Sequence, residues 1–313
     1  MPRTAAVTVR VPAKVNVQLA VGAVRPDGYH DLANVFLAVG LYDEVTVTPA
    51  DALRVTCTGP GSDQVPLDGG NLAARAAELL AAHHGRTPDV HVHIAKDIPV
   101  AGGMAGGSAD AAGALLACDT LWDTRTPREE LLELCAELGS DVPFSLVGGA
   151  ALGRGRGEQL TPLEVKGTFH WVFALADGGL STPEVYRECD RLRDLAAGTD
   201  PAFDLADPAA PEADAALLAA LRTGDAHDLA AALFNDLQPA AVSLRPSLAQ
   251  TLTAGADAGA LAGLVSGSGP SCAFLASDAD AAARIAGTLA ASGTCRTARP
   301  TTSPAPGATV TTP

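Results

Sequence analysis

The chain has 313 residues, 47% of them apolar, and a formal net charge of −15. At about 150 residues per domain this length favours two domains, and the composition is that of a folded protein with a substantial core. So large an acidic excess repels polyanions, and we therefore expect no nucleic acid and no membrane as partners. A phosphorylated ligand would need a local site made of backbone N–H groups, a metal ion and a few basic side chains.

Export signals and disulfide patterns are not evident in the sequence. The six cysteines form no short C-x-x-C pair, which predicts reduced thiols and a cytoplasmic protein. The first 14 residues lack the basic and apolar regions of a signal peptide. The uncharged run 258–277 approaches the length of a membrane span, but Ser-Gly-Ser-Gly-Pro at its centre predicts a helix end, a loop and a strand start.

The first half of the chain shows both strand and helix patterns. Alternating apolar residues over 7–21 predict a long strand with one buried face, broken or bulged at Pro12. Arg-Pro-Asp-Gly at 25–28 predicts a turn. The next predicted elements are a strand over 43–48, a helix that Asn71 caps and that ends at Gly85, and a strand over 90–95.

A capping box is predicted at 126–129, Thr-Pro-Arg-Glu, with proline at the first helical position and Gly139 ending the helix. We expect a surface excursion over 196–214 and a frayed or edge-bound tail over 300–313. The remaining predicted elements are strands over 150–153, 171–176 and 272–275, and helices over 214–222, 225–235, 243–255 and 278–291.

Four glycines lie in the segment 99–110, between a predicted strand and an Ala-rich helix. Glycine lets the backbone approach a phosphate, and the helix N-terminus adds unpaired N–H donors. A flexible turn would have the same composition. The segment contains neither a Walker loop nor a dinucleotide-binding fingerprint, so its composition leaves both interpretations open.

Other polar residues are also ambiguous when each is taken alone. Lys14 and Asn16 share one face of the first strand, which could contact a ligand or simply face solvent. Asp141 follows a helix end, where it could be an N-cap or a catalytic base. The loop 266–271, Ser-Gly-Ser-Gly-Pro-Ser, could be an ordinary connection.

A zinc site is not predicted. His91 and His93 are separated by one residue in the strand predicted over 90–95, so both rings share one face of it. An exposed strand face explains this spacing, and we assign no metal to the pair.

The order of five segments along the chain is more specific than any one of them. They are P-A-K-V-N-V at 12–17, R-P-D-G-Y-H-D-L at 25–32, P-V-A-G-G-M-A-G-G-S-A-D at 99–110, L-G-S-D-V-P-F at 138–144 and S-G-S-G-P-S at 266–271. In this order they resemble the GHMP kinases over nearly the whole chain.

The resemblance implies an α+β protein with a two-domain GHMP kinase fold. Residues 1–163 would form an ATP-binding domain similar to the second domain of ribosomal protein S5, and 164–313 a substrate-binding α+β domain, with the active site in the cleft between them. The implied reaction transfers the γ-phosphate of ATP to the 2-hydroxyl of 4-diphosphocytidyl-2-C-methyl-D-erythritol, in the methylerythritol phosphate route to isopentenyl diphosphate. ATP and Mg²⁺ would be the cofactors, and the chain a monomer or weak homodimer.

The same resemblance implies roles for individual residues. Asp141 would take the hydroxyl proton and Lys14 would polarise that hydroxyl. The implied substrate-binding residues are Asn16, Tyr29, His30, Thr182 and Tyr186, with the cytosine held by Tyr29, His30 and Tyr186. Ser108 could also contact Mg²⁺. The implied ATP-binding residues are Pro99, Val100, Ala101, Gly102, Gly103, Met104, Ala105, Gly106, Gly107, Ser108 and Ala109, with Asn71, Leu72 and Lys96 near the adenosine.

The sequence departs from the family pattern in the glycine-rich segment. Ala101 and Ala105 stand where many members have glycine, and Ala109 where many have serine. Because alanine disfavours positive φ, we expect no positive φ at 101 or 105.

Two alternative functions remain. The chain could be another GHMP kinase, acting on homoserine, mevalonate or a sugar, or a non-catalytic sensor that binds a nucleotide. The aromatic residues Tyr29 and Tyr186 favour an acceptor that carries a base, since the smaller acceptors offer nothing to stack. Retention of Lys14 and Asp141 argues against a sensor.

Overall fold

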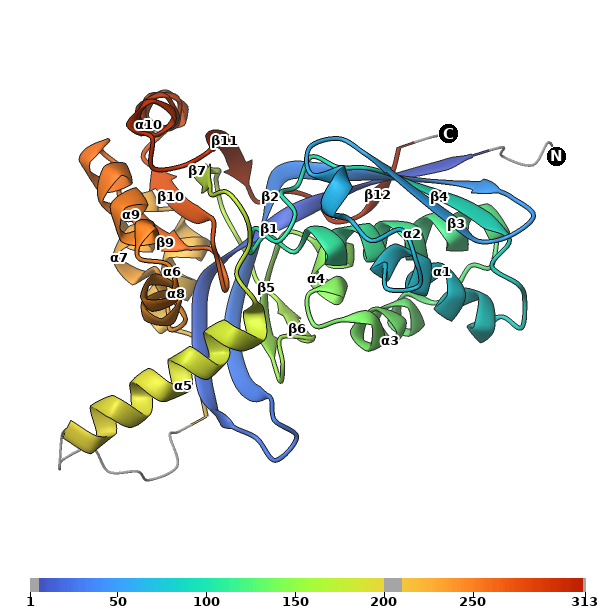
Figure 1. Ribbon diagram of the computed structural model, residues 1–313, viewed down its shortest axis with the longest axis horizontal. Helices are drawn as coiled ribbons and strands as arrows, with labels where there is room; N and C mark the ends of the chain where they lie inside the picture. The colour runs from blue at the N-terminus through green and yellow to red at the C-terminus, as the bar shows by residue number, and fades with distance from the viewer. Residues whose placement is uncertain (1–5, 200–209, 312–313) are drawn as a thin grey trace.

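A long antiparallel hairpin runs through the middle of the molecule and belongs to the larger of two sheets (Figure 1). The computed structural model describes residues 6–199 and 210–311. The hairpin consists of β1 (Val7–Val24) and β2 (His30–Pro49). Up to residue 163 it is followed by β3 (Arg54–Thr58), the 3₁₀ helix η1 (Ser62–Gln64), α1 (Leu72–His83), β4 (Val90–Ala95), α2 (Gly106–Trp122), α3 (Arg128–Leu138), α4 (Val142–Val147), β5 (Ala150–Arg154) and β6 (Gln159–Pro162).

The second half of the chain forms a smaller antiparallel sheet and a second group of helices. This sheet has the order β11-β7-β10-β9, from Thr297–Ser303, Phe169–Leu175, Cys272–Ala276 and Ala262–Val265. The other elements are α5 (Thr182–Thr199), α6 (Ala215–Thr223), α7 (Ala226–Ala232), β8 (Phe234–Asn235), α8 (Gln238–Leu244), α9 (Ser247–Asp257), α10 (Ala279–Ser292) and β12 (Thr309–Val310). In Figure 1, α1–α4 gather at one end of the molecule and α6–α10 at the other.

The larger sheet contains strands from both halves of the chain. Its main order is β12-β1-β2-β4-β3, with β5 also on β2, β6 on β5 and β8 on β1. The edge of β1 that faces away from β2 is therefore covered by β8 and β12, which come from the second half of the chain.

The bulge predicted near Pro12 is confirmed, because the register between β1 and β2 shifts between Pro12 and Ala13. The prediction of one buried face holds only for the start of the strand. Every residue from Val11 to Gly22 is buried, and this includes Lys14, Asn16 and Gln18. The face that alternation assigned to solvent is thus covered by other parts of the chain, since Lys14 Nζ donates to the carbonyl of Gly103 and Gln18 Nε2 to the carbonyl of Glu212.

Helix ends confirm one cap and contradict another. Asn71 caps α1, since its Oδ1 accepts hydrogen bonds from the N–H groups of Ala73 and Ala74. The predicted capping box at the start of α3 is wrong. Pro127 is the N-cap, and Thr126 donates its hydroxyl to Asp119 Oδ1 at 2.6 Å, so that hydroxyl does not cap the helix. Gly139 ends α3 as predicted.

Other predicted elements of the second half need correction. The helix predicted over 243–255 is two helices, α8 and α9, which meet at Pro246 because proline lacks the N–H that a continuous helix requires. The helix predicted over 225–235 ends at Ala232. Helix α5 was not predicted, and it extends into the expected excursion over 196–214, of which 200–209 lies outside the described residues.

The C-terminal region is edge-bound, as predicted for 300–313, over the part up to residue 311. Strand β11 forms the edge of the smaller sheet, and β12 pairs with Val9 and Arg10 at the edge of the larger one. Across 6–199 and 210–311, the structure has no helix that is long and apolar enough to cross a bilayer. The uncharged run 258–277 forms β9, a loop and β10.

Helix α2 packs on the hairpin at a glycine, and this contact sets the position of the helix. A Cβ atom on Gly113 would lie 2.8 Å from Val45 Cγ2 and 2.9 Å from Val11 Cγ2. Valine side chains are stiff at χ1 and cannot move aside easily. The absence of a side chain at Gly113 therefore lets α2 lie close to both strands.

We expect Gly113→Ala to lower the free energy of unfolding by about 1–3 kcal/mol, because overpacking outweighs the better helix propensity of alanine. Gly287 in α10 is the matched control, since it is exposed and nothing lies within 4 Å of its added Cβ. Gly287→Ala should raise the free energy of unfolding by up to about 1 kcal/mol. Urea denaturation of both variants measures this, and equal effects would contradict the packing argument.

Candidate active site

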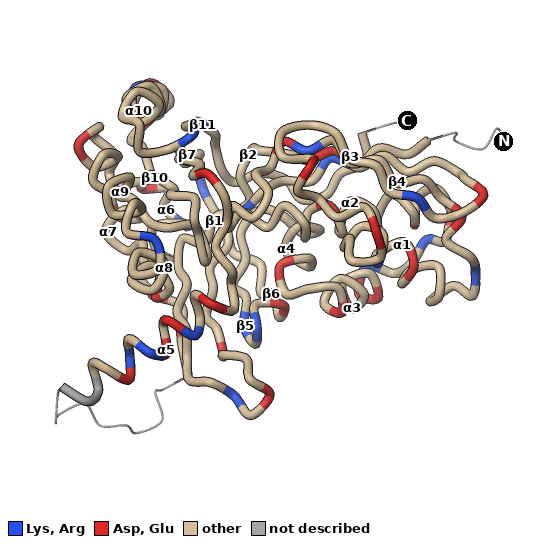
Figure 2. Tube along the Cα trace, in the orientation of Figure 1, with Lys and Arg blue, Asp and Glu red and all other residues tan. Residues whose placement is uncertain are grey.

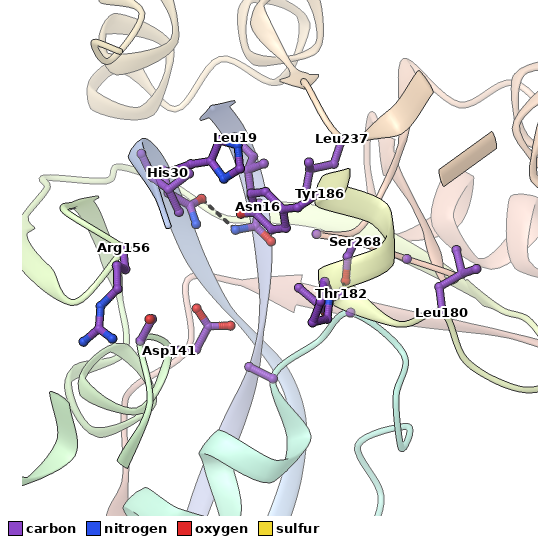
Figure 3. A pocket seen from close by; sticks show the side chains of 18 of the residues that line it. Asn16, Leu19, His30, Asp141, Arg156, Leu180, Thr182, Tyr186, Leu237 and Ser268 are labelled. Atoms are coloured by element: carbon purple, nitrogen blue, oxygen red, sulfur yellow. Dashed lines mark hydrogen bonds between the residues drawn. The ribbon is translucent and has the colours of Figure 1, made fainter. Parts of the chain in front are cut away.

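A cavity of about 850 Å³ lies where the hairpin, the glycine-rich loop and the second half of the chain meet. Its walls include the loop 101–108, the start of α5 and the loop 267–269. Figure 3 shows Arg156 and Asp141 on one side of this cavity and Thr182 and Ser268 on the other. Segments far apart in the sequence therefore form one site.

Basic residues do not gather on one face of the molecule. Figure 2 shows Lys and Arg scattered along the chain among a larger number of acidic residues. Within the cavity, however, Lys14, Arg156 and Arg187 line the walls together with the acidic Asp141 and Asp190. The site thus carries the local positive charge that an anionic ligand requires.

Lys14 is held by a chain of hydrogen bonds on one face of the hairpin. Its Nζ donates to Asn16 Oδ1 at 2.6 Å, and Asn16 Nδ2 donates to Asn34 Oδ1 at 2.6 Å. Asp141 Oδ2 lies 3.7 Å from Lys14 Nζ. Burial lowers the pKa of Lys14, and Asp141 partly opposes this shift. The bulge at Pro12 and the two-residue spacing together bring the amine and both amides into the cavity.

Asp141 stands at the N-cap position of α4, but its side chain accepts no capping hydrogen bond. The carboxylate is partly exposed and lines the cavity beside Ser140. The side chain therefore does not act as the N-cap that the sequence allowed, and its role as a catalytic base stays a prediction. The backbone of Asp141 begins a helix, while its side chain is available for chemistry.

The glycine-rich loop packs directly on the loop 266–269. Gly103 has a φ of 72°, and a Cβ there would lie 2.1 Å from the Ser266 carbonyl oxygen. The carbonyl of Gly103 accepts hydrogen bonds from Lys14 Nζ and from Ser266 Oγ, both at 3.1 Å. Only glycine fits here, and the second loop is more than an ordinary connection.

The expectation of negative φ at the two alanines is wrong. Ala101 has a φ of 53° and Ala105 a φ of 60°. Ala105 is the N-cap of α2, so the left-handed residue turns the chain into the helix. Its conformation costs of order 1 kcal/mol or more, which the surrounding packing must offset. The backbone shape of the loop thus does not depend on glycine at these two positions.

The loop contributes most of its predicted ATP-binding residues to the cavity, but not all. Ala101, Gly102, Gly103, Ala105, Gly106, Gly107 and Ser108 line it. Met104 and Ala109 are fully buried beneath the loop, and Pro99 and Val100 line a separate cavity of about 320 Å³. The first turn of α2 presents unpaired N–H groups beside the lining residues Gly106, Gly107 and Ser108.

The residues predicted near the adenosine lie outside the main cavity. Asn71 caps α1, and Leu72 is close enough to Gly107 to contact a Cβ there, at 3.7 Å. Lys96 is buried, and its Nζ bonds to the carboxylates of Asp43 and Asp110. Burial would lower the pKa of Lys96, but these two carboxylates raise it overall. The Lys96 amine is therefore engaged within the protein.

An aromatic group forms the other end of the cavity. The rings of His30 and Tyr186 have centroids 5.0 Å apart, and His30 Nε2 lies 2.9 Å from Asp190 Oδ1. Burial raises the pKa of Tyr186, which keeps its hydroxyl neutral. Tyr29, the residue before His30, is 53% exposed and lines the same cavity. Thr182 Oγ1 lies 2.9 Å from Ser268 Oγ.

Among the lining residues that the sequence analysis did not assign to the site are Asn34, Asp190 and Arg156. Asn34 orients Asn16 from the neighbouring strand, and Asp190 contacts His30 from α5. Arg156 lies between two glycines in the turn from β5 to β6, and this isolated cation was the one available signal. The contacts of Asn34 and Asp190 depend on strand register and helix docking, which no local pattern reveals.

Metal ligands do not cluster among residues 6–199 and 210–311, where no group of three or more His, Cys, Asp or Glu side chains could hold a metal ion. His91 and His93 instead share Thr56 Oγ1 as a hydrogen-bond partner. Ser108 lines the cavity at the start of α2 and offers a hydroxyl oxygen there.

Each half of the chain contains a segment that matches a known protein family. Residues 71–149 match the family described as GHMP kinases N terminal domain, and 217–294 match GHMP kinases C terminal. The chain is 72% identical to 4-diphosphocytidyl-2-C-methyl-D-erythritol kinase of Streptomyces avermitilis, covering 97% of this chain and 99% of the relative. The protein of the same name from Thermobifida fusca is 61% identical, with 97% and 98% covered.

Solved structures agree with these matches. A crystal structure of 4-(cytidine 5'-diphospho)-2C-methyl-D-erythritol kinase superposes with a TM-score of 0.73 at 33% identity, covering 94% of this chain and 98% of that one. Homoserine kinase from Cytophaga hutchinsonii reaches the same TM-score of 0.73 at 20% identity, covering 99% of each chain, which shows a shared fold alone. With two family matches and relatives of such identity over nearly its whole length, the chain belongs to the GHMP kinases and has their two-domain α+β fold.

Proposed function

We propose that this chain catalyses the ATP-dependent phosphorylation of the 2-hydroxyl of 4-diphosphocytidyl-2-C-methyl-D-erythritol. One observation carries the proposal. A single cavity is lined by the glycine-rich loop, the Lys14–Asp141 pair and the aromatic residues Tyr29, His30 and Tyr186. The names of the relatives that are 72% and 61% identical support the same reaction.

The Lys14–Asp141 pair suits attack by an alcohol. Asp141 accepts the proton of the acceptor hydroxyl while the oxygen of that hydroxyl bonds to the γ-phosphorus of ATP. The bond from this phosphorus to the β,γ-bridging oxygen breaks, and ADP is released. Lys14 polarises the hydroxyl and stabilises negative charge on the phosphoryl group. Phosphoryl transfer needs alignment and charge stabilisation more than covalent help, and fixed polar groups supply both.

The loop 101–108 and the start of α2 would hold the phosphates of ATP. Its glycines let backbone N–H groups approach, and the helix N-terminus favours negative charge. Mg²⁺ usually takes one or two protein oxygens together with waters and substrate phosphates, which the Ser108 hydroxyl fits. When bound, Mg²⁺ reduces the charge on the phosphates.

The aromatic end would hold the cytosine. Tyr29 and Tyr186 offer rings for stacking, and the His30 imidazole offers a hydrogen bond while Asp190 orients it. Asn16 and Thr182 line the same cavity, and the rest of the acceptor would lie against them.

We also propose the domain boundaries, the cellular location, the oligomeric state and the pathway of the enzyme. Residues 1–163 form the ATP-binding domain and 164–313 the substrate-binding domain. The protein acts in the cytoplasm as a monomer or weak homodimer, with ATP and Mg²⁺, without nucleic acid or membrane. Its reaction belongs to the methylerythritol phosphate route to isopentenyl diphosphate.

A panel of acceptors tests the reaction. With Mg-ATP we expect ADP release on 4-diphosphocytidyl-2-C-methyl-D-erythritol and none above background on mevalonate, homoserine or galactose, since these three have no base for the aromatic end. Turnover of one of the three in its place would identify another GHMP kinase. Silence on all four, with ATP still bound, would favour a sensor.

Replacing the proposed base gives a second prediction. Asp141→Asn should lower kcat by roughly 10²- to 10⁴-fold, because the amide cannot accept the hydroxyl proton. The Kd for ATP, measured by calorimetry, should change little. Asp123→Asn is the matched control, since Asp123 is exposed and lies outside the cavity lining. Turnover of Asp141→Asn at the wild-type rate would remove Asp141 from the mechanism.

The aromatic end gives a third prediction. Tyr29→Ala should raise the KM for the acceptor roughly 5- to 100-fold, the range of a lost base–aromatic stack. The kcat and the KM for ATP should stay near wild type. Tyr29→Phe keeps the ring and should behave as wild type in steady-state assays. An unchanged acceptor KM in Tyr29→Ala would refute the cytosine assignment.

A further inference from the structure

Arg156 occupies a well-anchored position at the rim of the cavity. The carbonyl of Gly155 accepts a hydrogen bond from Leu32 N–H at 2.8 Å, which ties the turn to β2. Gly157 N–H donates to the Arg154 carbonyl at 3.0 Å, and Arg156 N–H donates to Glu158 Oε2 at 2.7 Å. The backbone at Arg156 is therefore fixed, and only its side chain is free to turn.

The guanidinium of Arg156 has unused hydrogen-bond donors. Its Nε lies 3.9 Å from Glu158 Oε2, which is too long for a hydrogen bond. Among residues 6–199 and 210–311 the structure gives no hydrogen bond from this guanidinium. Arg156 Cζ lies 5.1 Å from the centroid of the Tyr29 ring, and its side chain lines the cavity on the side of Asp141 (Figure 3). A cation with free donors thus stands beside the aromatic end.

We propose that Arg156 binds the diphosphate of the acceptor and so selects a nucleoside-diphosphate-linked alcohol over a neutral one. This inference rests on the proposed function. The base is held at Tyr29 and the reacting hydroxyl at Lys14 and Asp141, so the diphosphate that joins them must cross the wall between these residues. Arg156 lines that wall and contacts Tyr29. Its fork of N–H groups matches phosphate oxygens in pairs.

The other cations of the cavity are less suited to this role. Lys14 already donates to Asn16 and to the Gly103 carbonyl, and it stands beside Asp141. Arg187 donates its Nε to the Pro183 carbonyl of its own helix. Because the chain carries a net charge of −15, a diphosphate without its own cation would be repelled.

The phosphates of ATP could in principle use the same guanidinium. The contact with Tyr29 favours the acceptor, since Tyr29 lies at the aromatic end and the glycine-rich loop offers backbone donors for ATP. Loss of the Arg156 side chain distinguishes the two ligands, because it should raise the KM of the one whose phosphates Arg156 binds.

Arg156→Ala tests the assignment, with Arg154→Ala as the matched control. Arg154 is an exposed arginine of the same hairpin and does not line the cavity. We expect Arg156→Ala to raise the KM for 4-diphosphocytidyl-2-C-methyl-D-erythritol roughly 10- to 100-fold, as for lost charge-assisted hydrogen bonds. The KM for ATP should stay near wild type, and Arg154→Ala should match wild type in both constants.

CDP and cytidine differ only in the diphosphate, so their binding to each variant measures its contribution. The ATP site is filled by a non-hydrolysable analogue in both measurements. Calorimetry should show that Arg156→Ala raises the Kd for CDP by a similar factor and leaves the Kd for cytidine unchanged. Equal weakening of both ligands would mean that Arg156 acts through the Tyr29 ring, and a raised KM for ATP alone would assign the cation to ATP. Either result overturns the inference. Wild-type chain that turns over no acceptor and binds no CDP would overturn the proposed function itself.

Discussion

The close approach of two loops determines the geometry of the whole site. The Gly103 carbonyl accepts from Lys14 Nζ, which belongs to the hairpin, and from Ser266 Oγ, which belongs to the second half of the chain. A side chain at Gly103 would collide with the Ser266 carbonyl. One backbone oxygen therefore fixes the relative positions of the amine, the glycine-rich loop and the smaller sheet. Asn235 reinforces the same junction, because its Nδ2 donates to the carbonyls of Val265 and Gly267 at 2.8 and 2.7 Å.

The charge distribution of the chain leaves few basic side chains at the cavity. The chain contains three lysines, of which Lys14 faces the cavity, while Lys96 is neutralised by buried aspartates. Burial raises the pKa of Asp110 despite the neighbouring amine, and Asp43 and Asp110 both bond to that amine. A Cβ atom on Gly106 would lie 3.1 Å from the Lys96 Nζ of this cluster, so the amine is close to the glycine-rich loop but engaged by the two aspartates. Under the proposed function, anion binding would therefore depend on backbone N–H groups and on Lys14, Arg156 and Arg187 at the walls.

The sequence predicted what short-range patterns control. Alternation identified β1, and the Asn71 cap and the Gly139 stop were read correctly because each depends on neighbours within a few residues. The capping box failed because Asp119, seven residues before Thr126, competes for its hydroxyl. Positive φ at Ala101 and Ala105 could not be foreseen, since tertiary packing imposes it against local preference. The full burial of β1, the Asn34 bridge and the position of Arg156 all arise from contacts between distant segments.

The two short strands on the outer edge of β1 bear on how the protein is made. That edge is covered at Val9 and Arg10 by β12 and at Gln18 and Leu19 by β8, so β1 is synthesised well before either of these two neighbours. Until then its unpaired N–H and C=O groups form an open strand edge, which invites pairing with other chains. Nascent copies on neighbouring ribosomes share this exposure, and a chaperone that shields strand edges would protect the N-terminal half throughout translation.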